Sequence, residues 1–351
     1  MSKNRQYQYC TKDGQFSEKF APYSLLILFQ RLNHFTIMQF EWKGVFPAIT
    51  TQFTADDQLD LQMFEKNLYA QLEAGIHGVI LGGTLGESST LTREEKEILI
   101  RFTKEKVAGR IPVILNIAEG ATKAAVNEAQ WAEQLGVDGL MLLPPMRYKA
   151  DDRETVQFFS TVARSVSLPI LIYNNPVDYR IMVTPDMFAQ LTDCANIQAV
   201  KDSTRDVSNV TRMINRFGNR YRILCGVDPI AMESLLMGAS GWVGGLVNAF
   251  PRETVLLYHL VQSRQIDKAL QVHRWFLPLL ELDLSPKLVQ YIKLAASITG
   301  IGAEYVRPPR LPLVGEERQQ ILSLIQKAMT AEPAWMRDLQ VLQETAAALH
   351  S

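Results

Sequence analysis

The stretch "PILIYNNPVDYRIMVTPDMFAQLTDCANIQAVKDST" (169–204) decides the fold, because two short apolar runs flank a helical segment in it. The runs are "PILIYN" (169–174) and "IQAVK" (197–201). Between them, "VTPDMFAQLTDC" has Thr184 in the N-cap position and Pro185 at the first helical position. Strands that are apolar without alternation are typical of a parallel sheet with both faces covered.

The same alternation of strand and helix continues in both directions along the chain. Amphipathic segments separate the runs, and one of them opens with a capping box, Thr92 with Glu95, and stops at Gly109. Six further runs are "GVFPAIT" (44–50), "GVILGG" (78–83), "PVILNI" (112–117), "GLMLLP" (139–144), "YRILCG" (221–226) and "GWVGG" (241–245). Eight such strands predict a (β/α)8 TIM barrel of roughly 250 residues. A doubly wound sheet is the alternative, but its G-x-G-x-x-G turn does not follow the first run.

The barrel is predicted to occupy residues 38–251. Residues 252–351 continue as additional C-terminal helices packed on the barrel, for example "SPKLVQYIKLAASITGIG" (285–302) and "GEERQQILSLIQKAM" (315–329). Residues 1–37 lack clear periodicity, so we expect a poorly ordered extension or an upstream start with Met38 as the functional beginning; an interaction arm is the alternative.

The composition argues against several classes of function. The 351 residues carry 36 Lys and Arg against 37 Asp and Glu, a net charge of −1, which gives no electrostatic footprint for nucleic acid or an anionic membrane. The 3 cysteines are widely spaced and fit no disulfide framework, and the 5 histidines show no ligand spacing, so we expect a reducing compartment, no metal site and no cofactor. No apolar run reaches the ~18 residues of a membrane span, so the predicted location is the cytoplasm.

Lys201 is the most informative residue, because it ends an apolar strand. Reactive groups of such barrels collect at the C-terminal ends of the strands. A lysine held against apolar walls has a lowered pKa, so its neutral amine can form an imine with a 2-oxo acid. Tyr173 ends the preceding strand and could move protons in that chemistry. Alternatively, Lys201 is a solvated rim residue or pairs with Asp202 or Asp228, and Tyr173 only packs.

The turn "GGTLGES" (82–88) follows the second strand. It lacks the G-K-[ST] ending of a P-loop, so nucleotide binding is not expected. Its glycines free backbone N–H groups that, with the Thr84 hydroxyl, could bind a substrate carboxylate. A plain tight turn is the alternative.

Taken together, "GGTLGES", "YNNP" (173–176) and "IQAVKDST" (197–204) resemble the dihydrodipicolinate synthase / N-acetylneuraminate lyase family of Schiff-base aldolases. The resemblance covers about residues 40–315 and includes "LCGVD", "GWVGGLVNAFP" and "RPPRLPL". It implies that Lys201 forms the imine, that Tyr173 is the family's strand-five tyrosine, and that Thr84 with Gly83 holds the substrate carboxylate. It also implies that Gly226 and Val243 line the pocket.

Two departures from the family pattern lie in the loops after the second and fourth strands. Leu85 stands where the family has a second hydroxyl, which weakens one contact to the carboxylate. In "PPMRYK", Met146 and Arg147 replace a pair of tyrosines, the second of which reaches a neighbouring subunit in the synthases. That relay is therefore missing unless Tyr148 takes it over.

A third departure follows the fifth strand. The synthases carry an arginine five residues after the tyrosine, for the carboxylate of the semialdehyde substrate, whereas this chain has Asp178, with Arg180 displaced by two. Arg147 or Arg180 could bind a carboxylate from another direction, or both could be surface residues. Together with Leu85 and Asn175, these residues should decide the substrate.

The leading hypothesis is therefore a cytoplasmic Schiff-base lyase outside the lysine-pathway synthases, acting on a small 2-oxo acid. The reaction is aldol cleavage or condensation involving pyruvate, or dehydration or deamination through the same enamine, for example of a hydroxypyrroline carboxylate. A true 4-hydroxy-tetrahydrodipicolinate synthase and a catalytically silent barrel that binds a metabolite are the alternatives. The resemblance also implies a homo-oligomer, a dimer or tetramer.

Overall fold

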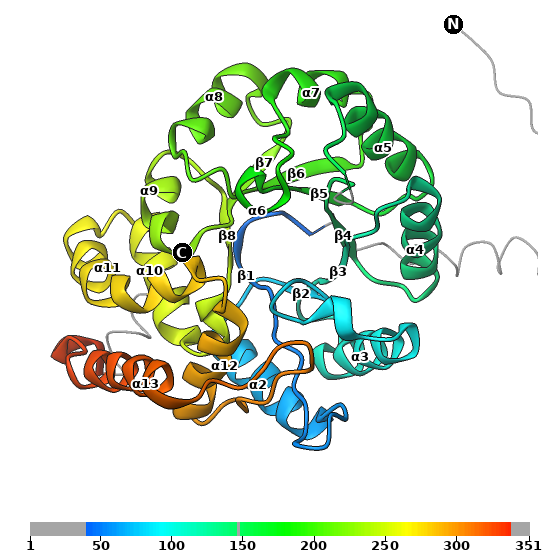
Figure 1. The fold of residues 1–351 in the computed structure, drawn as a ribbon. Helices are drawn as coiled ribbons and strands as arrows, with labels where there is room; N and C mark the ends of the chain where they lie inside the picture. The colour runs from blue at the N-terminus through cyan, green and yellow to red at the C-terminus, as the bar shows by residue number, and fades with distance from the viewer. Residues whose placement is uncertain (1–39, 146–147, 338–351) are drawn as a thin grey trace, which may run out of the picture. The chain divides into compact units, whose positions relative to one another are not determined.

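The fold is a barrel of eight parallel strands surrounded by helices (Figure 1). The computed structural model describes residues 40–145 and 148–337. The predicted extension 1–37 and Arg147 lie outside the described residues.

All eight predicted apolar runs form strands. They are β1 (Gly44–Pro47), β2 (Val79–Leu81), β3 (Val113–Ile117), β4 (Gly139–Leu142), β5 (Ile170–Asn174), β6 (Ile197–Asp202), β7 (Arg222–Cys225) and β8 (Gly241–Gly244). From β2 to β8, each strand pairs in parallel with the next one in sequence, and β1 pairs in parallel with β8. The Ile49 N–H donates to the Ile80 carbonyl at 3.0 Å, and the His77 N–H donates to the Val45 carbonyl at 2.9 Å. These bonds bring β1 to β2, so the predicted (β/α)8 class is confirmed.

Most of the helices form an outer ring around the strands, whereas the short α6 lies at the barrel mouth (Figure 1). They are α2 (Leu61–Glu73), α3 (Arg93–Val107), α4 (Thr122–Gln134), α5 (Asp152–Arg164), α6 (Pro176–Tyr179), α7 (Pro185–Gln190), α8 (Ser208–Phe217), α9 (Ala231–Leu236), α10 (Pro251–Gln262), α11 (Ile266–Leu280), α12 (Leu288–Ile298) and α13 (Gly315–Thr330). The capping box of Thr92 with Glu95 is present, and the Thr184 hydroxyl accepts from the Met187 N–H. The local signals for helix starts were therefore sufficient at both positions.

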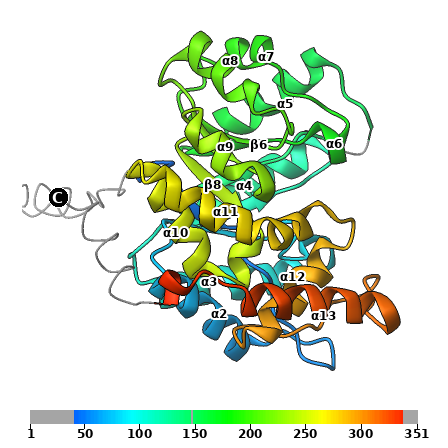
Figure 2. The same ribbon diagram turned by 90° about the vertical axis from the view of Figure 1, so that its left-hand side faces the viewer.

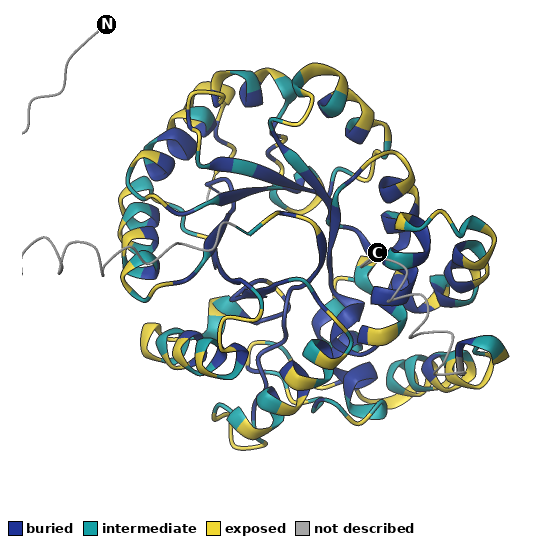
Figure 3. Ribbon diagram, turned by 180° about the vertical axis from the view of Figure 1, so that it is seen from behind, coloured by how far each residue is buried: buried dark blue, intermediate teal, exposed yellow. Residues whose placement is uncertain are grey.

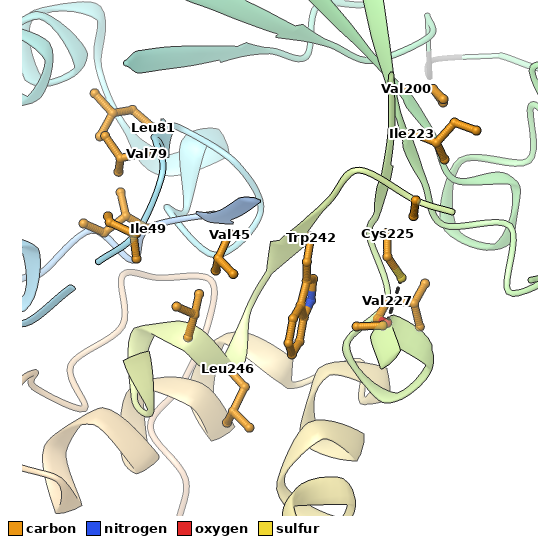
Figure 4. Packing of buried hydrophobic residues seen from close by; sticks show 14 of the residues in the cluster. Val45, Ile49, Val79, Leu81, Val200, Ile223, Cys225, Val227, Trp242 and Leu246 are labelled. Atoms are coloured by element: carbon orange, nitrogen blue, oxygen red, sulfur yellow. Dashed lines mark hydrogen bonds between the residues drawn. The ribbon is translucent and has the colours of Figure 1, made fainter. Parts of the chain in front are cut away.

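Buried side chains form one layer inside the barrel and another between the barrel and the helices. Each strand supplies one inward residue: Phe46, Ile80, Ile114, Met141, Leu171, Ala199, Leu224 and Val243. Their neighbours along the strands point outward, as Figure 4 shows for Val45, Val79 and Trp242. Figure 3 shows the strands as an almost continuously buried ring. Because both strand faces are apolar, the strands read as unbroken hydrophobic runs.

The C-terminal segment packs on one side of the barrel. Helix α13 contacts both α11 and α12 (Figure 2). Leu288, Val289 and Ile292 pack against the cluster inside the barrel, next to the 3-10 helix Glu281–Leu284. This segment therefore contributes to the mouth of the barrel as well as to its outer surface. Among the described residues, no helix is long and apolar enough to cross a membrane.

Candidate active site

Lys201 and Tyr173 lie side by side at the C-terminal ends of β6 and β5. The two residues are register partners, and the Lys201 Nζ lies 4.1 Å from the centroid of the Tyr173 ring. Both stand two positions beyond an inward-facing residue of the apolar layer, Ala199 on β6 and Leu171 on β5. Because side chains alternate along a strand, this spacing aims both into the barrel mouth.

The surroundings of Lys201 favour its neutral form. The residue is 7% exposed. Burial lowers the pKa of its amine, and the nearby carboxyls of Asp283 and Asp228 only partly oppose that shift. Asp202 does not pair with it, because its carboxylate accepts from Thr204 N at 2.9 Å and from Asn209 Nδ2 at 2.8 Å. The alternatives of a solvated rim lysine and of a pair with Asp202 therefore do not hold.

Gly226 leaves room for the Lys201 side chain. A Cβ at this position would lie 2.6 Å from both Cγ and Cε of Lys201 and 2.2 Å from the Ser203 Oγ. Ser203 Oγ donates to the Gly226 carbonyl at 2.9 Å, which fixes the loop after β6 to the loop after β7. Only glycine allows this approach.

Tyr173 keeps its proton in this environment. Burial raises the pKa of its hydroxyl to about 12, although hydrogen bonds with Ser203 and Asn175 act in the opposite direction. Asn175 Nδ2 donates to the Tyr173 hydroxyl at 3.2 Å and to Asp178 Oδ2 at 2.7 Å. The phenol is thus held beside the amine in a form that can donate a proton and take it back.

The turn after β2 reaches the same pocket, which Gly83, Thr84 and Leu85 line. Within the described residues, the N–H groups of Thr84 and Leu85 have no hydrogen-bond acceptor in the protein. Leu85 is 4% exposed and packs with the apolar layer inside the barrel. At the position where the family pattern has a second hydroxyl, this chain therefore has an apolar side chain. The turn therefore offers backbone donors and one hydroxyl to an anion.

Tyr179, at the end of α6, connects this turn with Tyr173. Its ring meets the Tyr173 ring edge-on, with the centroids 5.5 Å apart. Burial raises the pKa of the Tyr179 hydroxyl, while a hydrogen bond with the Thr84 side chain lowers it in part. Thr84, Tyr179 and Tyr173 thus line one wall of the pocket in succession.

A buried ion pair anchors the turn from behind. Lys293 Nζ on α12 lies 2.6 Å from Glu87 Oε1, and both side chains are 0% exposed. Glu87 Oε2 accepts from the Arg307 N–H at 3.0 Å. The C-terminal helices therefore position the turn after β2, which explains why they accompany the barrel.

Two carboxyls lie close to Lys201 on the side of β7 and β8. Asp228 is fully buried and accepts from Trp242 Nε1 at 2.8 Å, from Leu246 N at 2.7 Å and from Gly245 N at 3.1 Å. Asp283, in the 3-10 helix before α12, lines the pocket, and its Oδ2 accepts from Asp228 N at 3.4 Å. Burial and the neighbouring Asp228 raise the pKa of Asp283 to about 8.

The model of the dihydrodipicolinate synthetase family matches residues 41–328. The chain belongs to this family. A 4-hydroxy-tetrahydrodipicolinate synthase of Exiguobacterium sibiricum is 33% identical over 273 residues, which cover 78% of this chain and 92% of the relative. One of Methanopyrus kandleri is 30% identical and covers 83% and 97% of the two chains. The crystal structure of YagE from Escherichia coli K12, a prophage protein of the dihydrodipicolinic acid synthase family in complex with pyruvate, matches with a TM-score of 0.77 at 29% identity, covering 82% and 99%.

Membership makes this protein a lyase of the class I aldolase type. The other sequence-predicted residues are distributed unevenly around its pocket. Gly226, Val243 and Asp178 line it, whereas Arg180 is exposed and is not part of the lining. Tyr148 is 55% exposed and does not line the pocket of its own subunit, so its role in a relay to a neighbouring subunit stays a prediction.

Sequence reasoning missed four polar residues of this dihydrodipicolinate synthetase family site: Tyr179, Ser203, Arg205 and Asp283. Ser203 and Tyr179 follow Lys201 and Tyr173 by two and six positions, so their place in strand-end loops was a usable signal. Arg205 lines the pocket from the loop after β6, where its backbone has a φ of 61°. Among the described residues, no group of three or more His, Cys, Asp or Glu side chains could hold a metal ion.

Proposed function

We propose that this lyase forms an imine between Lys201 and a small 2-oxo acid and breaks a bond of the bound substrate through the enamine. The observation that carries the proposal is the buried Lys201 amine, with its lowered pKa, 4.1 Å from the ring of Tyr173. A neutral amine is the nucleophile that imine formation needs. Tyr173 donates the proton that the carbinolamine oxygen requires on leaving as water, and it takes the proton back during hydrolysis.

The carboxylate of the substrate is bound by the turn after β2. The N–H groups of Thr84 and Leu85 and the Thr84 hydroxyl are available there, opposite Lys201 across the mouth of the barrel. Tyr179 extends the hydroxyl row from Thr84 to Tyr173 within one subunit. We propose that this row does the work of the inter-subunit tyrosine that the sequence lacks.

The size of the cavity supports a small substrate. Its volume is about 80 Å³. A water molecule needs roughly 10–15 Å³ on the same scale, so the space suits a molecule of a few heavy atoms beyond the imine carbon. Asp178 stands where a synthase needs a cation for its second substrate, which favours a catabolic lyase over 4-hydroxy-tetrahydrodipicolinate synthesis. Dehydration or deamination, for example of a hydroxypyrroline carboxylate, and aldol cleavage all use the same enamine.

Borohydride reduction in the presence of pyruvate, followed by peptide mass spectrometry, tests the proposal. We expect the reduced pyruvyl adduct on Lys201. Lys293 is the internal control, because it is equally buried and burial lowers its amine pKa to about 8, but its amine is bonded to Glu87 and does not line the pocket. Adduct on neither lysine with a panel of 2-oxo acids would overturn the proposal, and equal labelling of both would show that burial alone makes a lysine reactive here.

We also propose a homo-oligomer, a dimer or tetramer, located in the cytoplasm. Two large apolar side chains near the C-terminal helices support an interface between copies: Leu311 is 72% exposed and Val314 is 74% exposed. Sedimentation of the wild-type protein and of the double variant Leu311→Ser/Val314→Ser tests the assembly. We expect the variant to dissociate at a higher concentration than the wild type.

A further inference from the structure

Asp283 is a carboxyl in the active-site pocket that imine chemistry at Lys201 does not require. It comes from the 3-10 helix Glu281–Leu284, far along the chain from the strand ends. Tyr173 approaches Lys201 from β5, whereas Asp283 lies against the loops that follow β7 and β8. A substrate bound to Lys201 therefore has an acid–base group on each side.

The surroundings of Asp283 favour the protonated acid. The charged and titratable groups that face it are Asp228, Lys201, Asp178 and Tyr173. Burial raises the pKa of Asp228 as well, but Asp228 accepts hydrogen bonds from three N–H groups, and these favour its ionised form over that of Asp283. Two adjacent buried carboxyls cannot both ionise at low cost, so the proton of the pair resides on Asp283. The raised pKa of Asp283, about 8, agrees with this arrangement.

The position of Asp283 is also suited to reach the bound substrate. The Asp228 N–H holds its Oδ2, and the Oδ1 side lies against Gly245, where a Cβ would come within 2.6 Å of Oδ1. Gly245 thus makes room for the carboxyl at the edge of the pocket. A hydroxyl on the fourth carbon of a 2-oxo acid is three bonds from the imine carbon, within about 4 Å of it. In so small a cavity, such a hydroxyl lies close to the wall that Asp283 forms.

We propose that Asp283 is the proton donor to a hydroxyl group that leaves from the fourth carbon of a 4-hydroxy-2-oxo acid bound to Lys201, which makes the enzyme a dehydratase. This inference rests on the proposed imine function. Tyr173, which gave its proton to the leaving carbinolamine oxygen, takes a proton from C3, and this gives the enamine. The C2–C3 electron pair then forms the C3–C4 double bond, the iminium at C2 is restored, and the C4–O bond breaks as Asp283 supplies the proton. Water leaves, Asp283 regains a proton from solvent, and hydrolysis of the iminium releases an unsaturated 2-oxo acid.

Aldol cleavage would need a base near the C4 hydroxyl in place of an acid. It breaks the C3–C4 bond when a base removes the proton of the C4 hydroxyl. A carboxyl that holds its proton is a poor base, Tyr173 is engaged with the proton of C3, and burial raises the pKa of Tyr179. Asp178 lines the pocket, but its carboxylate is exposed and bonded to Asn175. The protonated Asp283 therefore favours loss of the hydroxyl over cleavage of the carbon–carbon bond.

Two substrates that differ only in the leaving group distinguish proton donation by Asp283 from a purely structural role of this residue. The probes are 4-hydroxy-2-oxopentanoate, which must lose hydroxide with a proton, and 4-fluoro-2-oxopentanoate, which loses fluoride without one. We expect Asp283→Asn to slow water loss by about 10²–10⁴-fold, the usual range for removal of a general acid, and to change fluoride loss less than tenfold. Glu281→Gln, an exposed carboxyl of the same 3-10 helix, is the control and should leave both rates unchanged.

Exchange of the pyruvate methyl protons in D₂O distinguishes failure of the proposed imine function from failure of the proposed role of Asp283. Exchange requires the imine and the enamine but no leaving group. If the wild type neither exchanges these protons nor forms the Lys201 adduct, the proposed function fails. If the wild type exchanges them and D283N slows water and fluoride loss equally, or if the wild type releases pyruvate and acetaldehyde instead of water, only the Asp283 role is overturned.

The wild type alone provides a second test that does not depend on how the variant folds. With the acid form of Asp283 as donor, water loss should decline above about pH 8, tenfold for each pH unit, while fluoride loss should not decline there. The same decline for both leaving groups would contradict the proposal.

Discussion

Replacing Gly226 by alanine should disable Lys201 without removing any reactive group. The new methyl carbon would lie 2.6 Å from two carbons of the Lys201 side chain and 2.2 Å from the Ser203 Oγ. Ordinary contacts between carbon atoms are about 3.5–4.0 Å, so the lysine must move by roughly 1 Å. A displacement of that size can cost about 10²-fold in rate, equivalent to about 2.7 kcal/mol in the activation barrier.

The assay is the rate of adduct formation at Lys201 with pyruvate and borohydride. We expect a decrease of about 10²-fold in Gly226→Ala, together with a loss of about 1–3 kcal/mol in the free energy of unfolding from overpacking. The double variant Gly226→Ala/Ser203→Ala removes the closest contact but leaves the two contacts with Lys201. Compared with Gly226→Ala alone, it should regain part of the stability but not the rate of adduct formation.

The rate of adduct formation and the stability together distinguish a displaced Lys201 side chain from a general loss of stability. If Gly226→Ala forms the adduct at the wild-type rate, the side chain of Lys201 is not held in the observed position, and the argument from its burial fails. If the double variant recovers rate and stability together, the contact with Ser203 is the one that matters.

Three further perturbations test other parts of the site. Tyr173→Phe should lower the rate of exchange of the pyruvate methyl protons by about 10²–10⁴-fold. Tyr179→Phe should lower this rate by at least tenfold while the Lys201 adduct still forms. Exchange at the wild-type rate in both variants would show that the row of hydroxyls from Thr84 to Tyr173 takes no part in the mechanism. The rate of adduct formation should level off at a pH well below 10.4, the usual pKa of lysine. Burial lowers the pKa of the Lys201 amine, and the reactive neutral form appears as the pH rises through that lowered value. A rate that still rises at pH 10 would mean that Lys201 is an ordinary amine. Lys293→Met should lower the free energy of unfolding in urea by about 3–5 kcal/mol, because Glu87 loses its buried partner. Adding Glu87→Gln should recover part of this free energy. An unchanged unfolding midpoint in Lys293→Met would show that the pair does not anchor the turn.

The fold was predictable because its signals are local. Each strand is a continuous apolar run, since it is buried inside and outside the barrel, and helix ends such as the capping box at Thr92 are written in short motifs. Eight such units leave few arrangements, because parallel strands need crossovers and a covered sheet. The path of residues 281–310 across the barrel mouth has no such local signal. It depends on long-range contacts such as that of Lys293 with Glu87.

The same distinction applies to the site. Lys201 and Tyr173 could be placed from the sequence because both end a strand, and strand ends of a barrel meet at one edge. Asp283 ends no strand, and nothing in "LELDLSP" (280–286) distinguishes its carboxyl from those of surface residues. Arg205 reaches the pocket through a left-handed backbone conformation that an Arg codes for only weakly. Residues that approach a site from irregular segments need the tertiary structure.

The charges around the pocket restrict what the far end of the substrate can carry. The described charged residues that line it are Lys201, Arg205, Asp178 and Asp283. Lys201 is used by the imine and Arg205 is exposed at the rim, so a second carboxylate inside the pocket would face Asp178 without a buried cation. Because Asp178 is exposed, two like charges 4 Å apart there repel by between about 1 kcal/mol, the value in water, and about 4 kcal/mol, the value at an effective dielectric constant of 20. A hydroxyl or an ammonium group at the same place would instead find an acceptor in Asp178, and a leaving hydroxyl would find a proton on Asp283. With an acidic residue in place of the synthases' arginine, we therefore expect a hydroxylated or amino-bearing 2-oxo acid to bind better than one with a second carboxylate at that end.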